Sequence, residues 1–174
     1  LRDDFELPGM KILQFAFDLK EAGQGGCVNA FLPHMYSPNC VVYTGTHDND
    51  TMEGWLSTAS KEELALIGEY LEGPGKTCPR KDLCRRLVQL AMASTAKFAV
   101  IPLQDIYGLG REARINTPST SDGKNWIWRM EDWMLVGEQS TEVVSWLKRL
   151  GLLYGRNVVA VVEPLEKGSE RSQG

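Results

Sequence analysis

The sequence predicts an α/β fold built on a parallel sheet that helices cover. Three short apolar runs, rich in β-branched or aromatic residues, are continuous rather than alternating, which is typical of strands buried on both faces. Helical patterns lie between and after these runs, and this order indicates βα units. A closed barrel needs about eight strands in ~250 residues. The residues alone therefore leave open a small open sheet or part of a larger barrel.

The predicted strands occupy residues 11–17, 40–46 and 98–103. Residues 18–40, between the first two strands, are rich in Gly, Asn and Pro and show no helical period, although parallel strands need a crossover connection. We expect a long loop here. Loops of that length in a compact domain are usually functional or mobile.

Three amphipathic helices are expected. The first begins at Ser60, which forms a capping-box pattern with Glu63, and it ends at a Gly-Pro-Gly sequence. The second begins near Pro79, and the third covers residues 141–150 and stops at Gly151. Apolar residues at helical spacing are expected in the core: Leu64, Ile67 and Leu71; Leu83, Leu87 and Leu90; Val143, Val144, Leu147 and Leu150.

Composition excludes several classes of function. The 174 residues suffice for one ordinary domain, and the formal net charge of −4 gives no general attraction to nucleic acid or anionic lipid. No run of 18 apolar residues is present, so no membrane span is expected, and the first residues do not have the pattern of a signal peptide.

The cysteines predict neither a metal site nor a disulfide framework. They stand at positions 27, 40, 78 and 84, none forms a Cys-x-x-Cys pair, and only two histidines could complete a zinc site. Reduced thiols are expected, and with no export signal they favour a cytoplasmic protein, or a plastid one if the source is photosynthetic.

The most informative stretch follows the second predicted strand. His47 and Asp48 lie where that strand ends, and catalytic groups of barrel enzymes lie at the carboxyl ends of strands. A carboxylate there could stabilise a positively charged transition state, and an imidazole could bond a substrate hydroxyl. Asp50 with Glu53 also matches a capping box, which favours a helix start. Asp48-x-Asp50 resembles a calcium loop only faintly, because the glycine and the distal glutamate are missing.

Four stretches, in order, carry a family resemblance. They are Leu-Pro-Gly-Met-Lys-Ile-Leu-Gln-Phe-Ala-Phe at 7–17, Phe-Leu-Pro-His-Met-Tyr at 31–36, Thr-Gly-Thr-His-Asp-Asn-Asp-Thr at 44–51, and the stretch from Pro102 through Asn116-Thr117-Pro118 to Arg129. Together they resemble the amylomaltases, the 4-alpha-glucanotransferases of glycoside hydrolase family 77, over roughly residues 5–156. Met35 stands where the family usually has Asn.

The resemblance implies a fold. Residues 1–156 would form the C-terminal portion, about the last three strands, of a (β/α)8 TIM barrel of the amylase-like type. Residues 157–174 would form a C-terminal extension that is polar and disordered after 164.

The resemblance also implies roles for particular residues. Asp48 matches the aspartate that stabilises the transition state, His47 the histidine that touches the sugar in the −1 site, and Asn116 a substrate-contacting asparagine. Phe15 and Phe17 are candidate sugar platforms, with core packing as the alternative.

Further positions have a weaker assignment. His34 lies in a loop that could approach the sugar. Gln104 and Asp105 are interpreted as structural. Trp126 and Trp128 alternate like a half-buried strand and are expected to pack.

The implied reaction is a retaining double displacement on α-1,4-glucans and maltooligosaccharides, with a sugar acceptor in place of water and no cofactor or metal. The family's nucleophile and acid/base lie upstream of Leu-Pro-Gly-Met, and neither motif occurs here. We expect the chain alone to be inactive and to need the upstream part of the barrel.

Three hypotheses stay open at this point. The first is a segment of a glucanotransferase. The second is a related starch hydrolase, since acceptor choice cannot be inferred from Asp48. The third is a non-catalytic truncated chain that binds sugar or a partner, which would bind maltooligosaccharide without turning it over.

Overall fold

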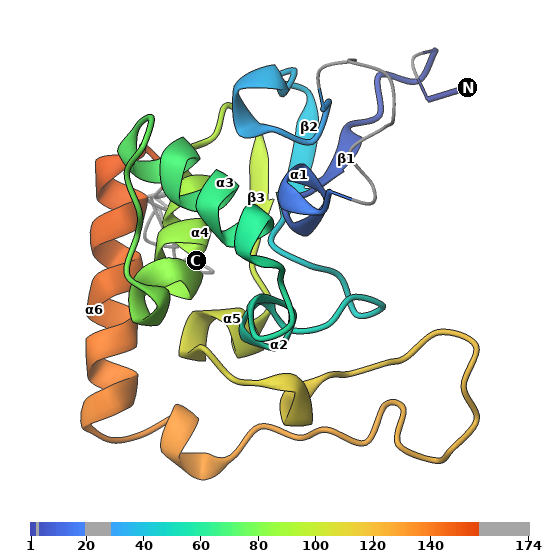
Figure 1. The fold of residues 1–174 in the computed structure, drawn as a ribbon. Helices are drawn as coiled ribbons and strands as arrows, with labels where there is room; N and C mark the ends of the chain where they lie inside the picture. Colours follow the sequence, from blue (N-terminus) through green and yellow to red (C-terminus); the bar gives the residue numbers. More distant parts are fainter. Residues whose placement is uncertain (3, 20–28, 157–174) are drawn as a thin grey trace, which may run out of the picture.

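The structure, a computed structural model, describes residues 1–2, 4–19 and 29–156. It contains a three-stranded parallel sheet, in the order β1-β2-β3 (Figure 1). The strands are β1 Gly9–Ile12, β2 Cys40–Tyr43 and β3 Phe98–Val100. The predicted α/β class and the parallel sheet are confirmed.

Helices of two kinds accompany the sheet. The longer ones connect or cover the strands, and the shorter ones follow strand ends or form single turns. The α-helices are α1 Gln14–Phe17, α2 Met52–Leu56, α3 Lys61–Glu72, α4 Leu83–Ala93, α5 Leu103–Tyr107 and α6 Glu138–Leu153. The 3-10 turns are η1 Pro33–Met35, η2 Arg80–Asp82, η3 Arg111–Ala113 and η4 Asp132–Met134.

The first strand is shorter than predicted and begins earlier. β1 ends at Ile12, and the apolar residues that follow form the single turn α1. Leu13 and Gln14 still donate backbone hydrogen bonds to Tyr43 and Thr44 before the chain turns. β3 likewise covers only the first half of its predicted range, because Pro102 precedes α5 and cannot donate to a ladder.

The helices follow their capping signals with two exceptions. The capping box of Ser60 and Glu63 is present at α3. The predicted box at Asp50 is wrong: Thr51 is the N-cap of α2, and its hydroxyl accepts from the Gly54 N–H. The third helix passes Gly151 and ends at Leu153, so the predicted stop is also wrong.

The connection between β1 and β2 agrees with the expected loop where the structure describes it. Residues 18–19 and 29–40 contain one 3-10 turn and no α-helix. Cys27 and the predicted C-terminal extension, residues 157–174, lie outside the described residues.

The two faces of the sheet differ. Helices α3 and α4 lie on one side of it, and α6 packs against α4 from outside (Figure 1). The other face carries two rows of side chains that the strand register aligns. They are Met10, Val41 and Phe98 in one row and Ile12, Tyr43 and Val100 in the next. Met10, Phe98 and Val100 are 59%, 50% and 46% exposed, so this face is apolar and largely uncovered.

The described residues include no helix that combines the length and the apolar character needed to cross a membrane.

The buried carboxylate of Asp105 connects α5 with the end of β2 and the start of α2. Asp105 in α5 accepts a hydrogen bond from the Thr44 hydroxyl at the end of β2 and another from the Met52 N–H at the start of α2, at 2.7 Å. Its side chain is almost fully buried. Burial raises the pKa of the Asp105 carboxyl. The two hydrogen bonds act in the opposite direction, and the nearby Asp50 carboxylate raises the pKa further. The interpretation of Asp105 as structural agrees with this position.

We expect a comparison of Asp105→Ala with Asp105→Asn to distinguish the contribution of the hydrogen bonds to stability from that of the charge. Alanine leaves Met52 N–H and the Thr44 hydroxyl without partners, so it should lower the free energy of unfolding by about 2–3 kcal/mol. Asparagine keeps an oxygen for Met52 and an amide for Thr44, so its stability should stay close to that of the wild type.

The pH dependence tests the same group. A folded-state pKa above the ordinary value means that the folded chain binds the Asp105 proton more tightly than the unfolded chain does. The stability that this proton contributes is lost as pH rises through the folded-state pKa. Urea unfolding at acidic and neutral pH should therefore show Asp105→Asn gaining on the wild type as pH rises. A difference that is independent of pH would contradict the assignment.

Candidate functional site

A tight turn after β2 presents His47 and Asp48 to solvent. The side-chain oxygen of Asn49 accepts from both the N–H and the hydroxyl of Thr46, at 2.9 and 2.8 Å, and the Asn49 N–H donates to the Thr46 carbonyl at 3.1 Å. These bonds close the turn around the two residues between them. The side chains of His47 and Asp48 are 52% and 51% exposed.

The Asp48 carboxylate is bonded on one oxygen. Its Oδ1 accepts from Asn116 Nδ2 at 2.6 Å and lies 3.3 Å from His47 Nε2. No donor among the described residues bonds Oδ2. The structure thus brings together three of the residues that the resemblance assigned to the site, Asp48 and His47 from the loop after β2 and Asn116 from the segment after β3. The free oxygen can accept from a ligand hydroxyl.

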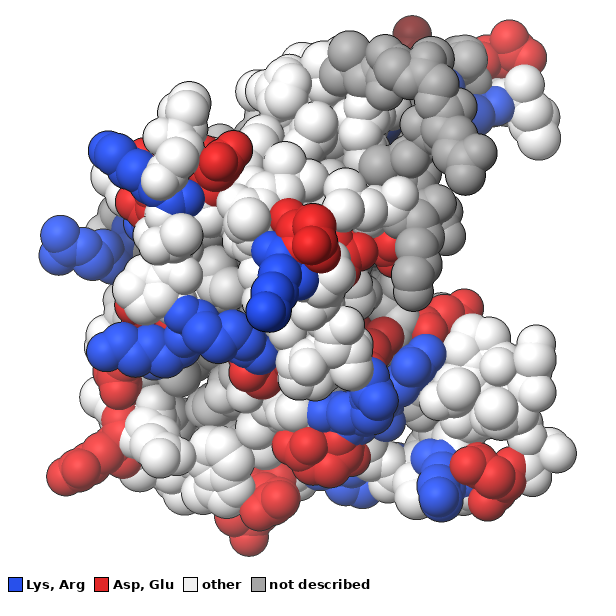
Figure 2. Space-filling model, in the orientation of Figure 1, with Lys and Arg blue, Asp and Glu red and all other residues white. Residues whose placement is uncertain are grey.

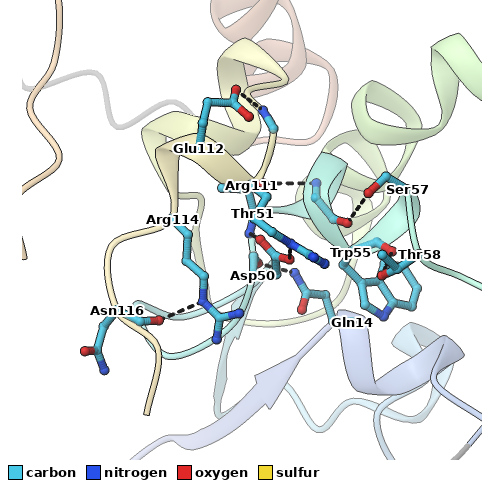
Figure 3. A network of polar contacts seen from close by, with 12 residues as sticks. Gln14, Asp50, Thr51, Trp55, Ser57, Thr58, Arg111, Glu112, Arg114 and Asn116 are labelled. Carbon is cyan, nitrogen blue, oxygen red and sulfur yellow. Dashed lines mark hydrogen bonds and ion pairs between the residues drawn. The ribbon is translucent and has the colours of Figure 1, made fainter. Parts of the chain in front are cut away.

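Two arginines connect these segments (Figure 3). Arg111 Nε donates to Asp50 Oδ2 at 2.7 Å, and the Asp50 carbonyl accepts from Gln14 Nε2 at 2.8 Å. Arg114 donates from Nε to the Asn116 carbonyl and from a terminal nitrogen to the Asp48 carbonyl, at 2.8 and 2.7 Å. Asp50 therefore supports the loop, while Asp48 faces outward.

The loop that bears Asp50 requires glycine at position 54. A Cβ built there would lie 2.5 Å from Asp50 Oδ1 and 2.9 Å from the Thr51 hydroxyl oxygen. The first turn of α2 thus packs directly against the carboxylate that Arg111 binds, which fixes Asp50 between the helix and the arginine.

An open cavity of about 690 Å³ lies beside this turn. His47 and Asp48 line one part of it, Phe15 another, and apolar side chains of the uncovered sheet face, among them Tyr43 and Val100, line the rest. Figure 2 shows acidic and basic side chains interspersed over this view of the surface. The cavity combines an apolar wall with a few polar groups, as small-molecule sites do.

The remaining predicted residues have different positions. Phe15 is half-buried and packs edge-on against Phe31, with ring centroids 5.4 Å apart. Phe17 is fully buried in the core, so the structure favours the packing alternative for this ring. His34 is exposed and bonds the Tyr70 hydroxyl at 3.0 Å, and it does not line the cavity.

Three site residues were missed or misjudged at the level of sequence. Arg111 and Arg114 gave no signal, because isolated arginines in a loop have many possible partners. Trp126 was expected in a half-buried strand. It is 57% exposed, has φ +65°, and its ring lies 5.1 Å from that of His47. The alternation of Trp126 and Trp128 led to a wrong prediction, because the Trp126 backbone is left-handed and a strand cannot continue through it.

Metal and thiol chemistry find little support in the described part of the chain. No group of three or more His, Cys, Asp or Glu side chains is arranged there to hold a metal ion. Cys40, Cys78 and Cys84 are free thiols, and burial raises the pKa of Cys84 to about 12, which disfavours the reactive thiolate.

Comparison with known proteins places the chain in a family. The family model described as 4-alpha-glucanotransferase, of glycoside hydrolase family 77, matches residues 1–135. The 4-alpha-glucanotransferase of Thermus thermophilus is 48% identical over 145 residues, 82% of this chain and 27% of the relative. The chloroplastic/amyloplastic enzyme of Arabidopsis thaliana is 44% identical over 156 residues, 90% of this chain and 25% of the relative.

A solved structure agrees with these relatives. An amylomaltase from Streptococcus agalactiae in complex with acarbose superposes with a TM-score of 0.75 at 26% identity, over 90% of this chain and 29% of that one. The chain spans about a quarter of the length of the curated relatives that it matches. The chain belongs to the 4-alpha-glucanotransferases of glycoside hydrolase family 77.

Proposed function

We propose that this chain is the C-terminal portion of the catalytic barrel of a 4-alpha-glucanotransferase, and that it contributes one of three catalytic carboxylates, Asp48. The observation that carries the proposal is the Asp48 carboxylate at the carboxyl end of β2, with one oxygen bonded to Asn116 and 3.3 Å from His47 Nε2, and the other oxygen open. Residues 1–156 would supply the barrel portion. The cytoplasm, or a plastid in a photosynthetic source, would be the compartment.

The uncovered sheet face supports the barrel. In a (β/α)8 barrel, helices cover the outside of the strands, and side chains from alternate positions fill the inside. Here helices lie on one face, and the opposite face presents the rows that include Met10, Val41 and Phe98. Strands from the upstream part of the barrel would pair with the free edges of β1 and β3 and bury these rows.

The proposed reaction transfers part of an α-1,4-glucan to glucose or a maltooligosaccharide. A nucleophilic carboxylate forms a bond to the anomeric carbon while the glycosidic bond breaks, and a second carboxylic acid protonates the departing oxygen. An acceptor hydroxyl then attacks the anomeric carbon, displaces the nucleophile and gives its proton to the second carboxylate. Both of these groups would come from the upstream part of the barrel.

Asp48 would act on the donor sugar. Its open oxygen would accept from a sugar hydroxyl, and Asn116 would turn its amide from Asp48 toward the sugar. The negative charge would favour the distorted, positively charged ring of the transition state. His47, with Trp126 against its ring, would bond a neighbouring hydroxyl.

A joined enzyme tests the function. This chain would replace the 145 matching residues in the Thermus thermophilus enzyme, and maltotriose disproportionation would be followed as glucose release. We expect transfer activity from the joined enzyme and none from this chain or from the Thermus portion alone. A folded joined enzyme without activity would count against the proposal, and release of glucose by the chain alone would mean that it has its own nucleophile and acid.

Asp48→Asn should lower kcat of the joined enzyme by about 100- to 1,000-fold, because the neutral amide cannot match the developing positive charge. Asp122→Asn is the matched control: it removes one negative charge from an exposed aspartate whose only described hydrogen bond is from the Lys124 N–H. It should leave kcat within about twofold. Equal effects of the two substitutions on kcat would mean that Asp48 takes no part in the reaction.

Phe98→Ala tests the barrel. In the chain alone, where this ring is half exposed, the substitution should lower the free energy of unfolding by less than about 1 kcal/mol. In the joined enzyme, where it would be buried, the loss should reach about 3–5 kcal/mol. Leu87→Ala, in the core of both, should cost about 2–5 kcal/mol in each. A small effect of Phe98→Ala in both proteins would contradict the barrel arrangement.

A further inference from the structure

We propose that Arg114 is a positioning residue: it holds Asp48 and Asn116 opposite each other by bonding the main-chain carbonyls of both. The kinetic consequence rests on the proposed function, while the geometric one does not. The two residues belong to segments that follow different strands, Asp48 after β2 and Asn116 after β3 and α5. Their side chains nevertheless meet at 2.6 Å.

The geometry of Arg114 fits this role. Its Nε donates to the Asn116 carbonyl at 2.8 Å, and its terminal nitrogen donates to the Asp48 carbonyl at 2.7 Å. One planar guanidinium thus spans both backbones. Figure 3 shows the Arg114 side chain beside Asn116, with the guanidinium directed toward the loop after β2.

Within the described residues, few other contacts connect the loop at 44–51 with the segment at 110–116. Among the backbone–backbone hydrogen bonds of the described residues, none joins the loop at 44–51 to the segment at 110–116. Side chains make the connection instead. Arg111 bonds the nearly buried Asp50 carboxylate, two residues beyond Asp48, so it fixes a different point of the loop. Arg114 is the arginine that bonds the backbone of Asp48 itself.

The choice of acceptors has a chemical consequence. If the guanidinium bonded the Asp48 carboxylate, it would occupy the oxygen that a sugar hydroxyl needs and would neutralise the charge. Because Arg114 bonds carbonyls, it orders the backbone and leaves Oδ2 open. A lysine has a single ammonium on a flexible stem and cannot span two fixed carbonyls with the same preorganisation.

The first test measures kcat and KM separately in the joined enzyme. Arg114→Ala should lower kcat about 10- to 100-fold, because a small misplacement of a group that acts in the transition state is costly. KM should change far less. Arg114→Lys should stay near the alanine variant. Arg85→Ala removes an arginine that bonds Glu142 at 2.8 Å on the surface between α4 and α6, and it should keep wild-type kinetics.

Two kinetic outcomes overturn the proposal. One is a kcat for Arg114→Ala equal to that of Arg85→Ala. The other is full recovery by lysine, which would assign the effect to charge rather than to the paired bonds. Thermal unfolding of every variant checks that the protein is folded. If Arg114→Ala is not folded, Arg114→Lys is used for the kinetic test in its place.

The second test does not depend on the reaction. The side-chain amide of Asn116 reports the bond to Asp48 through its NMR resonances and exchange with solvent, in the 174-residue chain and in the joined enzyme. Asp48→Ala identifies the unbonded signal. We expect Arg114→Ala to move the Asn116 signal toward that reference and Arg85→Ala to leave it in place. If wild-type joined enzyme is inactive, the proposed function fails, and this measurement still decides on Arg114: an unmoved signal overturns the proposal.

Discussion

The buried carboxylate of Asp105 is the contact on which the rest of the site depends. It joins Thr44, which directly follows β2, to the first turn of α2 at Met52, and the loop between these two residues carries His47 and Asp48. Both ends of that loop are therefore anchored to α5. A buried acid is costly unless its oxygens are hydrogen-bonded, and here each oxygen has a donor. Asp105 stabilises the position of the site without reaching the cavity.

Three aspartates within this small region have three different roles because their surroundings differ. Asp105 is buried and bonded by neutral donors, Asp50 is nearly buried and bound by Arg111, and Asp48 is half exposed with one oxygen open. Only the third combination gives a carboxylate that can bond a ligand. The sequence placed Asp48 and Asp50 two residues apart in one motif, and the fold separates their functions by turning one toward Arg111 and the other toward Asn116.

The sequence predicted the features that local patterns determine. Continuous apolar runs indicated the parallel strands, and the capping box at Ser60 located the start of α3. The resemblance brought Asp48, His47 and Asn116 together, although no spacing in the chain implies that position 116 meets position 48. What failed depended on tertiary contacts. β1 ends early because Leu13, Ala16 and Phe17 pack on the core from a helical turn, and Thr51 takes the cap that Asp50 was expected to provide because Arg111 engages Asp50.

In the proposed barrel, the position of Asp48 depends on contacts within this chain. Every described bond that holds Asp48 comes from residues 46–116, so its position does not require groups from other strands. A group that stabilises a transition state is effective when it is fixed beforehand, since reorganisation during the reaction would consume the gain. Attack and protonation, in contrast, need two further carboxyl groups that flank the scissile bond. Under the proposed function, those two groups would come from the upstream part of the barrel, while the three-stranded sheet described here positions Asp48 and its exposed face would be buried by the neighbouring strands.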